Sequence, residues 1–323
     1  MDIILSTKNL KKYFETKYGL VRAVDGISFN VIYGETFALV GESGSGKSTT
    51  GHMIVGIYEP TSGKIYFKGQ DISVPASKRP RFLRREIQIV FQDPASSLNP
   101  SMYIKDIVGM PMRVHGIVRD EGELKEKVME LLEEVDLPPE YYMYKKPREL
   151  GGGELQAVAI ARALSTNPKL IILDEPTSAL DVITQTKIIR LLTRLQQKQN
   201  LTYIFITHDL AVVRNFATRV AVMYLGKIVE VAPVNELFLR PQHPYTMMLL
   251  SSVPVISDEE EKIKPRKVRS VGEIPSAISP PPGCRFHTRC PFAMDICKTQ
   301  EPELRLIDKA KQHWVACHLV QMK

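Results

Sequence analysis

Residues 41–48 read Gly-Glu-Ser-Gly-Ser-Gly-Lys-Ser and match the pattern G-x-x-x-x-G-K-[ST] without a mismatch. The apolar run Glu35–Val40 precedes this stretch, and a helix-compatible segment begins at Lys47. Glycines let backbone N–H groups turn inward around phosphate oxygens, and the start of a helix adds its positive dipole. We therefore predict a phosphate-binding loop in which Lys47 reaches the β- and γ-phosphates of ATP and the Ser48 hydroxyl ligates Mg²⁺. The residues expected to contact nucleotide here are Gly41, Ser43, Gly44, Ser45, Gly46, Lys47, Ser48 and Thr49.

The composition is that of an ordinary globular protein. The chain has 323 residues, of which 44% are hydrophobic and 24% are charged, which suits one large domain with a smaller appendage. No segment has the roughly 18 consecutive apolar residues that a membrane-spanning helix needs. The N-terminus also lacks the apolar stretch of a secretory signal, so we expect the chain to stay in the cytoplasm. The net charge of +7 is compatible with nucleic acid or an acidic membrane as partner, but basic residues spread over a solvated face are favoured.

Short apolar runs alternate with amphipathic helical patterns along residues 35–224. The runs typical of strands are Glu35–Val40, Glu86–Phe91, Lys169–Asp174, Tyr203–Thr207 and Arg219–Tyr224. Between them, two sets of apolar residues at helical spacing each share one face: Leu124, Val128, Leu131, Leu132 and Val135, and Ile188, Leu191, Leu192 and Leu195. Strands that alternate with helices predict an α/β core with a largely parallel sheet.

The pattern changes from Pro254 onward, where prolines become frequent and the alternation fades. We therefore predict a boundary near residue 252, between a domain at residues 1–252 and a small C-terminal module at residues 253–323. A charged block that switches sign, residues 258–269, is interpreted as a linker.

Two carboxylates end the apolar strand Leu170–Asp174. Asp174 is placed to hold Mg²⁺ through water, and the adjacent Glu175 can polarise the water that attacks the γ-phosphate. His208 follows the strand Tyr203–Thr207, so it is expected at the carboxyl edge of the sheet, where open α/β folds bind ligands. There it can hydrogen-bond the γ-phosphate and hold the attacking water.

These elements, in this order, resemble the ATPase subunits of ABC transporters over roughly residues 3–250. The motifs that carry the resemblance are Gln92 as the Q-loop glutamine, Leu150–Gly153 with Gln156 as the signature, Ser178–Asp181 as the D-loop, Thr207–Asp209 as the H-loop, and Phe14 or Tyr13 as the aromatic platform for adenine. The resemblance implies an ABC-type P-loop ATPase core with an antiparallel β subdomain and a helical subdomain at about residues 93–160. It also implies that Gln92 contacts Mg²⁺ and the γ-phosphate, and that Gly151, Gly152, Gly153 and Asp181 contact nucleotide.

A narrower resemblance is to the ATPases of oligopeptide/dipeptide importers. It is carried by Gln92-Asp93-Pro94, Ser97-Leu98-Asn99-Pro100, His243-Pro244-Tyr245-Thr246, Pro281-Pro282-Gly283-Cys284, Arg289-Cys290-Pro291 and Val315-Ala316-Cys317-His318. The resemblance implies two membrane permease subunits, a second and different ABC ATPase subunit, and an extracellular solute-binding protein that delivers peptides or related small solutes, oligosaccharides among them. It places the chain peripherally, at the cytoplasmic face of the cell membrane.

The signature departs from the family's LSGGQ. Gly151 stands at the serine position, Glu154 at the glutamine position, and Ala157 where an arginine is expected. In this family ATP is sandwiched between the phosphate loop of one subunit and the signature of the other. Gly151 lacks the hydroxyl that would donate to the partner's γ-phosphate, a hydrogen bond worth about 1.5–3 kcal/mol, or one to two orders of magnitude in turnover. Gly152 and Gly153 still offer backbone donors.

We therefore hypothesise an asymmetric heterodimer. The site built on Lys47, Glu175 and His208 hydrolyses ATP, whereas the site completed by Gly151–Gly153 hydrolyses poorly or mainly holds the dimer shut. The alternatives are that glycine substitutes acceptably, or that these changes were introduced deliberately.

All four cysteines lie in the tail, at the spacing C-x₅-C-x₆-C-x₁₉-C: Cys284, Cys290, Cys297 and Cys317. Clustered cysteines in a reducing cytoplasm are more often metal ligands than disulfides. The close pairs of structural zinc sites are absent, and four thiolates can also bind an iron–sulfur cluster, so spacing alone leaves zinc, iron–sulfur and free buried thiols open. The resemblance to importer tails favours a [4Fe–4S] cluster of structural or regulatory role, with zinc as the alternative.

Two other classes compete with an importer subunit. A soluble ABC ATPase acting on nucleic acid or ribosomes would suit the positive charge, but such proteins commonly carry two cassettes or a long coiled-coil insertion, and the helical pattern Gly122–Val135 is too short for one. A regulator that binds ATP without hydrolysing it would suit the altered signature, but Glu175 and His208 argue against it. No nucleic-acid partner is expected.

Overall fold

The computed structural model describes residues 2–252 and 272–321, so the predicted linker at residues 258–269 lies outside the described residues. The chain divides into two compact units. One unit is Pro75–Ile206, and the other joins Asp2–Val74 to the segment that begins at Thr207. Within the described ranges, none of the helices has both the length and the apolar composition that crossing a membrane requires.

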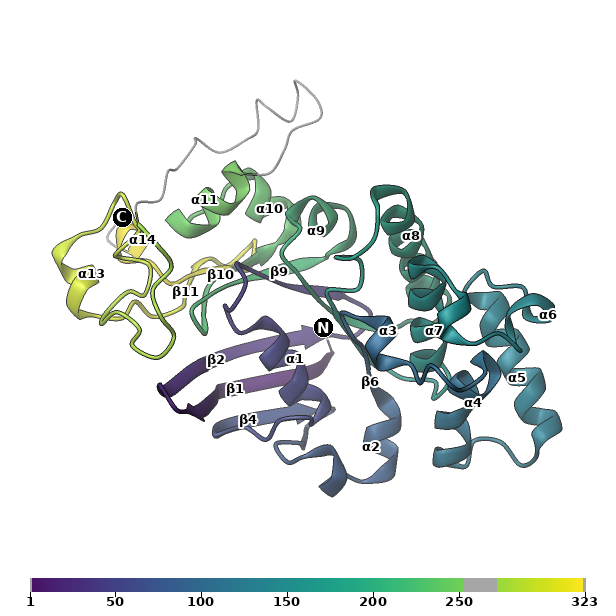
Figure 1. The fold of residues 1–323 in the computed structure, drawn as a ribbon. Helices are drawn as coiled ribbons and strands as arrows, with labels where there is room; N and C mark the ends of the chain where they lie inside the picture. The colour runs from purple at the N-terminus through teal and green to yellow at the C-terminus, as the bar shows by residue number, and fades with distance from the viewer. Residues whose placement is uncertain (1, 253–271, 322–323) are drawn as a thin grey trace. The chain divides into compact units, whose positions relative to one another are not determined.

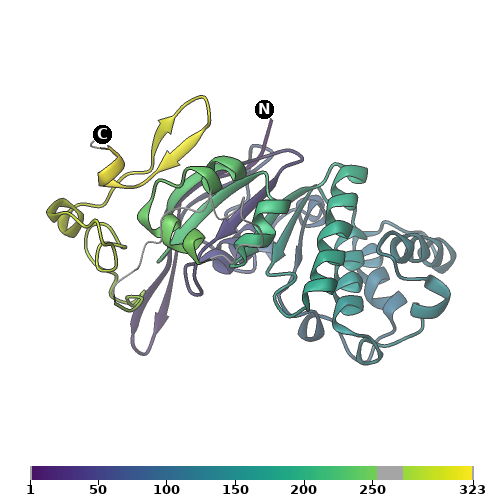
Figure 2. The ribbon, with the colours of Figure 1, turned by 90° about the horizontal axis from the view of Figure 1, so that it is seen from above.

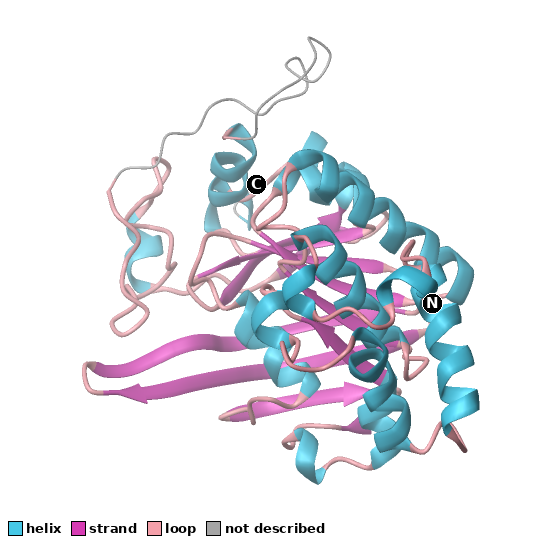
Figure 3. Ribbon diagram, turned by 45° about the vertical axis from the view of Figure 1, so that its right-hand side comes forward, coloured by secondary structure: helices cyan, strands magenta, loops and turns pink. Residues whose placement is uncertain are grey.

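The unit that joins Asp2–Val74 to the segment that begins at Thr207 starts with a long antiparallel sheet. Its strands are β1 (Ile3–Thr16), β2 (Gly19–Ile32), β4 (Ser62–Phe67) and β5 (Gln70–Asp71), in the order β2-β1-β4-β5. The β1–β2 hairpin runs from the pair Ile3↔Ile32 to the pair Thr16↔Gly19 and is the longest feature of the magenta strands in Figure 3. The fully buried side chains of Leu5, Leu10, Val24 and Val31 lie along this hairpin.

The same unit contains five strands in the order β11-β12-β10-β9-β3. They are β3 (Thr36–Val40), β9 (Arg219–Tyr224), β10 (Lys227–Pro233), β11 (Arg305–Asp308) and β12 (His313–Val315). Strand β3 is buried along its whole length and is parallel to β9. Tail strand β12 pairs with β10 at Glu230↔Val315, so the C-terminal module extends this sheet rather than standing apart from it. Figure 2 shows the two tail strands as a yellow hairpin.

Six helices of this unit are described. They are α1 (Lys47–Val55), α9 (Leu210–Phe216), α10 (Val234–Leu239), α11 (Pro244–Ser251), α13 (Asp295–Thr299) and α14 (His318–Gln321). Helix α1 follows β3 through the glycine-rich stretch 41–46, which is the strand–loop–helix order that the sequence predicts.

The unit Pro75–Ile206 holds three parallel strands and seven described helices. Strand β7 (Leu170–Asp174) pairs with β6 (Ile87–Val90) on one side and with β8 (Thr202–Thr207) on the other. Its helices are α2 (Arg81–Glu86), α3 (Pro94–Ser97), α4 (Ile104–His115), α5 (Glu121–Glu134), α6 (Pro139–Tyr142), α7 (Gly152–Leu164) and α8 (Val182–Gln199), with short 3₁₀ turns at Ala76–Lys78 and Pro147–Glu149. Helices α4, α5 and α7 pack against one another (Figure 1).

The predicted strands and helix faces are confirmed. Each of the five apolar runs forms a strand whose bounds lie within one residue of the predicted ones, and the prediction of α/β structure with antiparallel and helical parts holds. The buried residues on the two predicted helix faces are Leu124, Val128, Leu132 and Val135, and Ile188, Leu191, Leu192 and Leu195. The sequence did not predict β10 or the two tail strands.

Candidate nucleotide-binding site

The phosphate loop can be formed only with glycine at two of its positions. Gly41 and Gly46 have φ of 150° and 105°, in the region that side chains rarely adopt. A Cβ at Gly41 would lie 2.2 Å from the Met223 carbonyl oxygen, and one at Gly46 would lie 2.3 Å from that of Ala23. Strands β9 and β2 thus approach the loop so closely that they dictate its glycines.

Lys47 lies at the centre of this loop. Its side chain is almost fully buried, and the Nζ atom donates to the carbonyl oxygens of Gly41 at 2.8 Å and Glu42 at 3.0 Å. A hydrogen bond from outside the loop also holds its backbone: the Gly226 N–H donates to the Ser45 carbonyl at 2.9 Å. A buried cation held inside a turn that opens a helix is the arrangement that binds phosphate.

The two candidate aromatic platforms, Tyr13 and Phe14, have different surroundings. The Tyr13 hydroxyl donates to the Asp25 carboxylate, and burial together with that contact raises the pKa of Tyr13 to about 12. The Phe14 ring meets the edge of Tyr58, just after α1, with ring centroids 5.2 Å apart. Both rings belong to the unit that holds the phosphate loop, and the choice between them stays a prediction.

His208 lies directly after β8 and is exposed. The next residue, Asp209, caps helix α9 by accepting from the N–H groups of Ala211 and Val212. This cap fixes the backbone at His208 where the strand turns into the helix.

The other unit brings two predicted catalytic residues together. Gln92 follows β6 and Glu175 follows β7, and the Gln92 Nε2 atom donates to the Glu175 Oε2 atom at 3.0 Å. Glu175 has a φ of 46°, and its N–H donates to the Ile206 carbonyl at 2.9 Å. Asp174, immediately before it, is buried at the end of β7. A non-glycine residue held in the left-handed region marks a constrained position of the kind found at functional sites.

Asp181, predicted to contact nucleotide, caps helix α8. Its Oδ1 atom accepts from the N–H groups of Ile183 and Thr184, each at 3.0 Å, and its Oδ2 atom accepts from the Thr184 hydroxyl at 2.6 Å. These contacts, those from Thr184 first, lower the pKa of Asp181. The D-loop carboxylate therefore also has a structural role as a helix cap, which its motif does not indicate.

The altered signature forms the start of helix α7. Gly151 precedes the helix with φ −75° and ψ 164°, and its N–H donates to the Glu154 Oε2 atom at 2.7 Å. The other carboxylate oxygen of Glu154 accepts from the Tyr142 hydroxyl at 2.5 Å, and these two hydrogen bonds lower the pKa of Glu154. A Cβ at Gly151 would meet only Glu154 Oε2, at 3.7 Å, so a side chain fits there.

Gly153, by contrast, has no room for a side chain. A Cβ there would lie 2.5 Å from the Thr184 Cγ2 atom. Rotation of Thr184 would not relieve the clash cheaply, because its hydroxyl is bound to Asp181. We expect Gly153→Ser to destabilise the fold by about 1–3 kcal/mol, as overpacking does. Gly151→Ser, two residues away, should leave the melting temperature almost unchanged. Thermal unfolding of both variants checks this, and equal melting temperatures would contradict it.

The four cysteines are not assembled into a metal centre. Cys297 and Cys317 are buried, Cys284 and Cys290 are half-buried, and all four are free thiols. Burial raises the pKa of Cys284 to about 12 and that of Cys290 to about 11, and the neighbouring cysteines add to both effects. Within residues 2–252 and 272–321, no three His, Cys, Asp or Glu side chains are arranged to hold a metal ion. The geometry of the described residues therefore gives no support to the predicted metal set.

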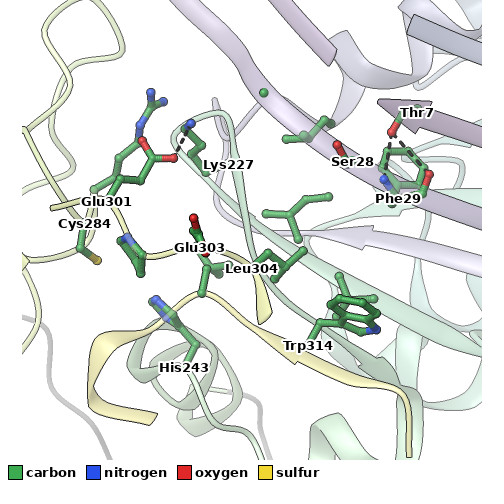
Figure 4. A pocket seen from close by; sticks show the side chains of 18 of the residues that line it. Thr7, Ser28, Phe29, Lys227, His243, Cys284, Glu301, Glu303, Leu304 and Trp314 are labelled. Atoms are coloured by element: carbon green, nitrogen blue, oxygen red, sulfur yellow. Dashed lines mark hydrogen bonds and ion pairs between the residues drawn. The ribbon is translucent and has the colours of Figure 1, made fainter. Parts of the chain in front are cut away.

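A cavity of about 660 Å³ lies in the unit that holds β1, β2 and β10 (Figure 4). Its walls include Ser28 of β2, Lys227 of β10, and His243, Cys284 and Trp314. Residues 41–48 are not among those that line it. The cavity is therefore separate from the phosphate loop and marks the junction of the tail with β2 and β10.

Two family models match the chain. The model for "ABC transporter" matches residues 24–178, and the model for "Oligopeptide/dipeptide transporter, C-terminal region" matches residues 229–297. The chain is 48% identical to the oligopeptide transport ATP-binding protein AppF of Bacillus subtilis, with 98% of each chain covered. It is 43% identical to the di/tripeptide transport ATP-binding protein DppF of Pseudomonas aeruginosa, again with 98% of each covered.

Solved structures show the same fold. The dimeric ATP-binding cassette MJ0796 bound to ADP and Pi matches with a TM-score of 0.64 and 31% identity, over 71% of this chain and 98% of that one. The CbiO1 subunit from Clostridium perfringens, part of an ABC transporter complex, matches with a TM-score of 0.65 and 32% identity, over 74% of this chain and 92% of that one.

Proposed function

Because the chain belongs to the ATP-binding subunits of oligopeptide/dipeptide ABC transporters, we propose that it powers the import of peptides or related small solutes, oligosaccharides among them. The chain is an ATPase of the ABC type. The observation that carries the proposal is the phosphate loop with its buried Lys47, which can bind a triphosphate. ATP binding closes a dimer and hydrolysis reopens it, a two-state motion biased by the ligand.

We propose specific roles for these residues in ATP hydrolysis. The loop from Gly41 to Thr49 binds the phosphates, with Lys47 on the β- and γ-phosphates and Ser48, Gln92 and Asp174 as the residues that would hold Mg²⁺. Mg²⁺ supplies positive charge against the phosphate oxygens. Glu175 accepts the proton of the attacking water, Gln92 orients Glu175, and His208 donates to the γ-phosphate. The hydrogen bond between Gln92 and Glu175 supports the role of Gln92 in orienting the Glu175 carboxylate.

The domain assignment is also a proposal. Residues 1–252 form the nucleotide-binding domain, residues 253–323 form the tail, and the helical subdomain at about residues 93–160 receives the permease. The packing of α4, α5 and α7 against one another supports a distinct helical subdomain. The relatives AppF and DppF are named for peptide transport, which supports two permease subunits as partners, and hence a peripheral position at the cytoplasmic face of the membrane. A second ABC ATPase and, indirectly, a solute-binding protein complete the proposed assembly.

For the tail we propose an iron–sulfur cluster on Cys284, Cys290, Cys297 and Cys317, with zinc as the alternative. The support is the chemistry of the donor set, since all four cysteines of the chain lie in the tail and none forms a disulfide. Metal analysis of anaerobically purified protein tests it. Brown protein that absorbs towards the blue and holds iron supports the cluster, colourless protein with zinc supports the alternative, and metal-free protein removes both.

The function is tested by purifying the chain from its native membrane. We expect two multi-span proteins and a second cassette to co-purify, and the complex to hydrolyse MgATP faster when its solute-binding protein is loaded with peptide. Recovery of nucleic acid or ribosomes instead would favour the soluble ABC ATPase that the charge of +7 suggests. A complex that retains no nucleotide and releases no phosphate would contradict the proposal.

We expect Gln92→Ala to uncouple ATP use from transport. Gln92 joins Glu175 to the segment that begins at Asp93 and enters the helical subdomain, so its loss breaks the link while leaving the phosphate loop intact. Transport per ATP hydrolysed should fall at least about fivefold, the lower end of typical coupling energies. ATP affinity should change less. Peptide uptake and phosphate release in proteoliposomes measure both, with Gln88→Ala on β6 as the matched control. Equal losses in uptake and in ATP affinity would contradict this role.

A further inference from the structure

An arginine of the C-terminal module is bound to the phosphate loop. Arg289 directs both terminal nitrogens at the carboxylate of Glu42, the second residue of the loop, with Nη1–Oε2 at 2.7 Å and Nη2–Oε1 at 3.0 Å. The Arg289 side chain is only 7% exposed, and that of Glu42 is 24% exposed. The pair joins residues 247 positions apart in the sequence. A two-point arginine–carboxylate contact fixes orientation as well as distance.

The backbone of Glu42 is held as well. Its N–H donates to the Tyr245 hydroxyl at 2.9 Å, and its carbonyl accepts from Lys47 at 3.0 Å. Tyr245 packs against Phe286 of the tail and against Tyr224, with ring centroids 5.3 Å and 4.6 Å apart. Glu42 is therefore held at its side chain, its N–H and its carbonyl. The tail supplies Arg289, which binds the side chain, and Phe286, which packs against the tyrosine that binds the N–H.

A second tail arginine binds the carboxylate that holds Tyr13, one of the two candidate adenine platforms. Arg285, which is also almost fully buried, binds the Asp25 carboxylate and the Leu225 carbonyl. Asp25 in turn accepts from the Tyr13 hydroxyl. The segment between Cys284 and Cys290 thus contacts both a phosphate-loop residue and the partner of a candidate adenine platform.

Because Glu42 is negatively charged, its contact with Arg289 should affect phosphate binding as well as the structure of the loop. A carboxylate in a loop that receives a triphosphate repels its ligand, and the repulsion is strong where water is partly excluded. The guanidinium of Arg289 offsets that charge and donates to both oxygens of the carboxylate. It thereby competes with the loop's N–H groups, which must stay open to phosphate. An uncompensated Glu42 would both repel the phosphates and accept hydrogen bonds from loop donors meant for them.

We propose that Arg289 is a positioning residue for ATP binding, through which the C-terminal module sets the affinity of the phosphate loop by neutralising and orienting Glu42. This inference rests on the proposed function, since it assigns a control on the same ATP site. The tail then acts on nucleotide through the ion pair of Arg289 with Glu42, with no need to touch the nucleotide itself.

The test uses the assembled complex and four forms of this chain: wild type, Arg289→Gln, Glu42→Gln and the double variant. Equilibrium binding of MgATP and steady-state hydrolysis are measured for each. We expect Arg289→Gln to raise the Kd and KM for MgATP about tenfold, as the loss of one charge-assisted contact does, with little change in kcat. The double variant, which removes both charges, should recover to within about threefold of wild type. Raising the salt concentration should reduce the loss of MgATP affinity in Arg289→Gln, because ions partly screen the uncompensated Glu42 carboxylate.

Lys298→Gln provides the matched control. Lys298 forms an ion pair with Asp295 at 2.8 Å in the same module, but both side chains are exposed. The Lys298→Gln variant should leave MgATP affinity unchanged, because exposed ion pairs contribute little free energy to the fold. An unchanged KM in Arg289→Gln would overturn the inference, and so would a defect that the double variant does not relieve. Wild-type complex that binds no MgATP would instead overturn the proposed function.

If Arg289→Gln does not fold, Glu42→Gln alone tests whether the charge of Glu42 opposes MgATP binding. It keeps the shape of the loop and removes only the negative charge, so the arginine's charge then acts on the phosphates. We expect its MgATP affinity to equal or exceed that of wild type. An affinity more than about tenfold lower would show that the Glu42 carboxylate itself assists binding, and would overturn the inference.

Discussion

Glu175→Gln is expected to reduce ATP turnover by about two to four orders of magnitude, the range that a general base contributes. Glutamine has nearly the same shape, so the hydrogen bond network around Gln92 can persist, but an amide cannot accept the proton of the attacking water. The backbone at Glu175 is held by its N–H contact to Ile206, so the substituted side chain should occupy the same position. MgATP affinity should therefore stay close to that of wild type, and the loss should appear in kcat rather than in KM.

Single-turnover hydrolysis in the assembled complex measures this loss, and equilibrium nucleotide binding measures the affinity. Glu126→Gln, an exposed position on α5, is a charge-matched control in the same unit and should turn over like wild type. A fall in kcat smaller than about tenfold would place the general base elsewhere. A large loss of nucleotide affinity would show that the Glu175 charge serves binding rather than proton transfer.

The parts of the site that the sequence predicts best are those where local backbone geometry dictates the residue. Gly41 and Gly46 must be glycine because backbone carbonyls of neighbouring strands leave no room for a Cβ, and this requirement appears in the sequence as a recognisable motif. Strand ends are predictable for a related reason. A short apolar run followed by a polar residue locates Asp174, Glu175 and His208 at the ends of β7 and β8 without any knowledge of tertiary contacts.

Contacts between distant segments leave no such pattern. Arg289 and Glu42 are 247 residues apart, and a single arginine or glutamate has no periodicity that signals a partner. The tail strands are missed for another reason. Strand β12 spans only His313–Val315, too short for alternation to show, and it is stabilised by pairing with β10 rather than by its own composition.

The cysteine cluster shows the limit of spacing as a guide. The interval between two thiols in the sequence does not determine their separation in space, and four cysteines in one module are compatible with several ligands or with none. The described residues contain no assembled metal site, and the proposed cluster is tested by metal analysis of the purified protein. The phosphate loop differs because its pattern specifies backbone conformation as well as residue type.

The altered signature allows the asymmetry to be tested by a gain of function. Gly151→Ser should raise the rate of the composite site that this chain's signature completes by about one to two orders of magnitude. The backbone at Gly151 already has the conformation that suits a helix-capping serine, and the nearest atom to a Cβ there is 3.7 Å away. The hydroxyl would restore a donor towards the partner's γ-phosphate without moving the helix. Serine is also a favourable residue before a helix, so stability should not fall.

The measurement isolates that composite site by placing Gly151→Ser in a chain that also carries Glu175→Gln. The site built on this chain's own Lys47 is then silent, and single-turnover hydrolysis reports the opposite site alone. Gly151→Ala in the same background adds the Cβ without the hydroxyl and should stay slow. If the serine and alanine variants hydrolyse at the same rate, the missing hydroxyl does not limit that site. If Glu175→Gln and the matching replacement in the partner ATPase cost the same turnover, the asymmetric heterodimer is wrong. If serine alone gives only part of the gain, adding Glu154→Gln should raise the hydrolysis rate further. The Glu154 carboxylate accepts from the Gly151 N–H and places a negative charge beside the γ-phosphate, and glutamine removes that charge.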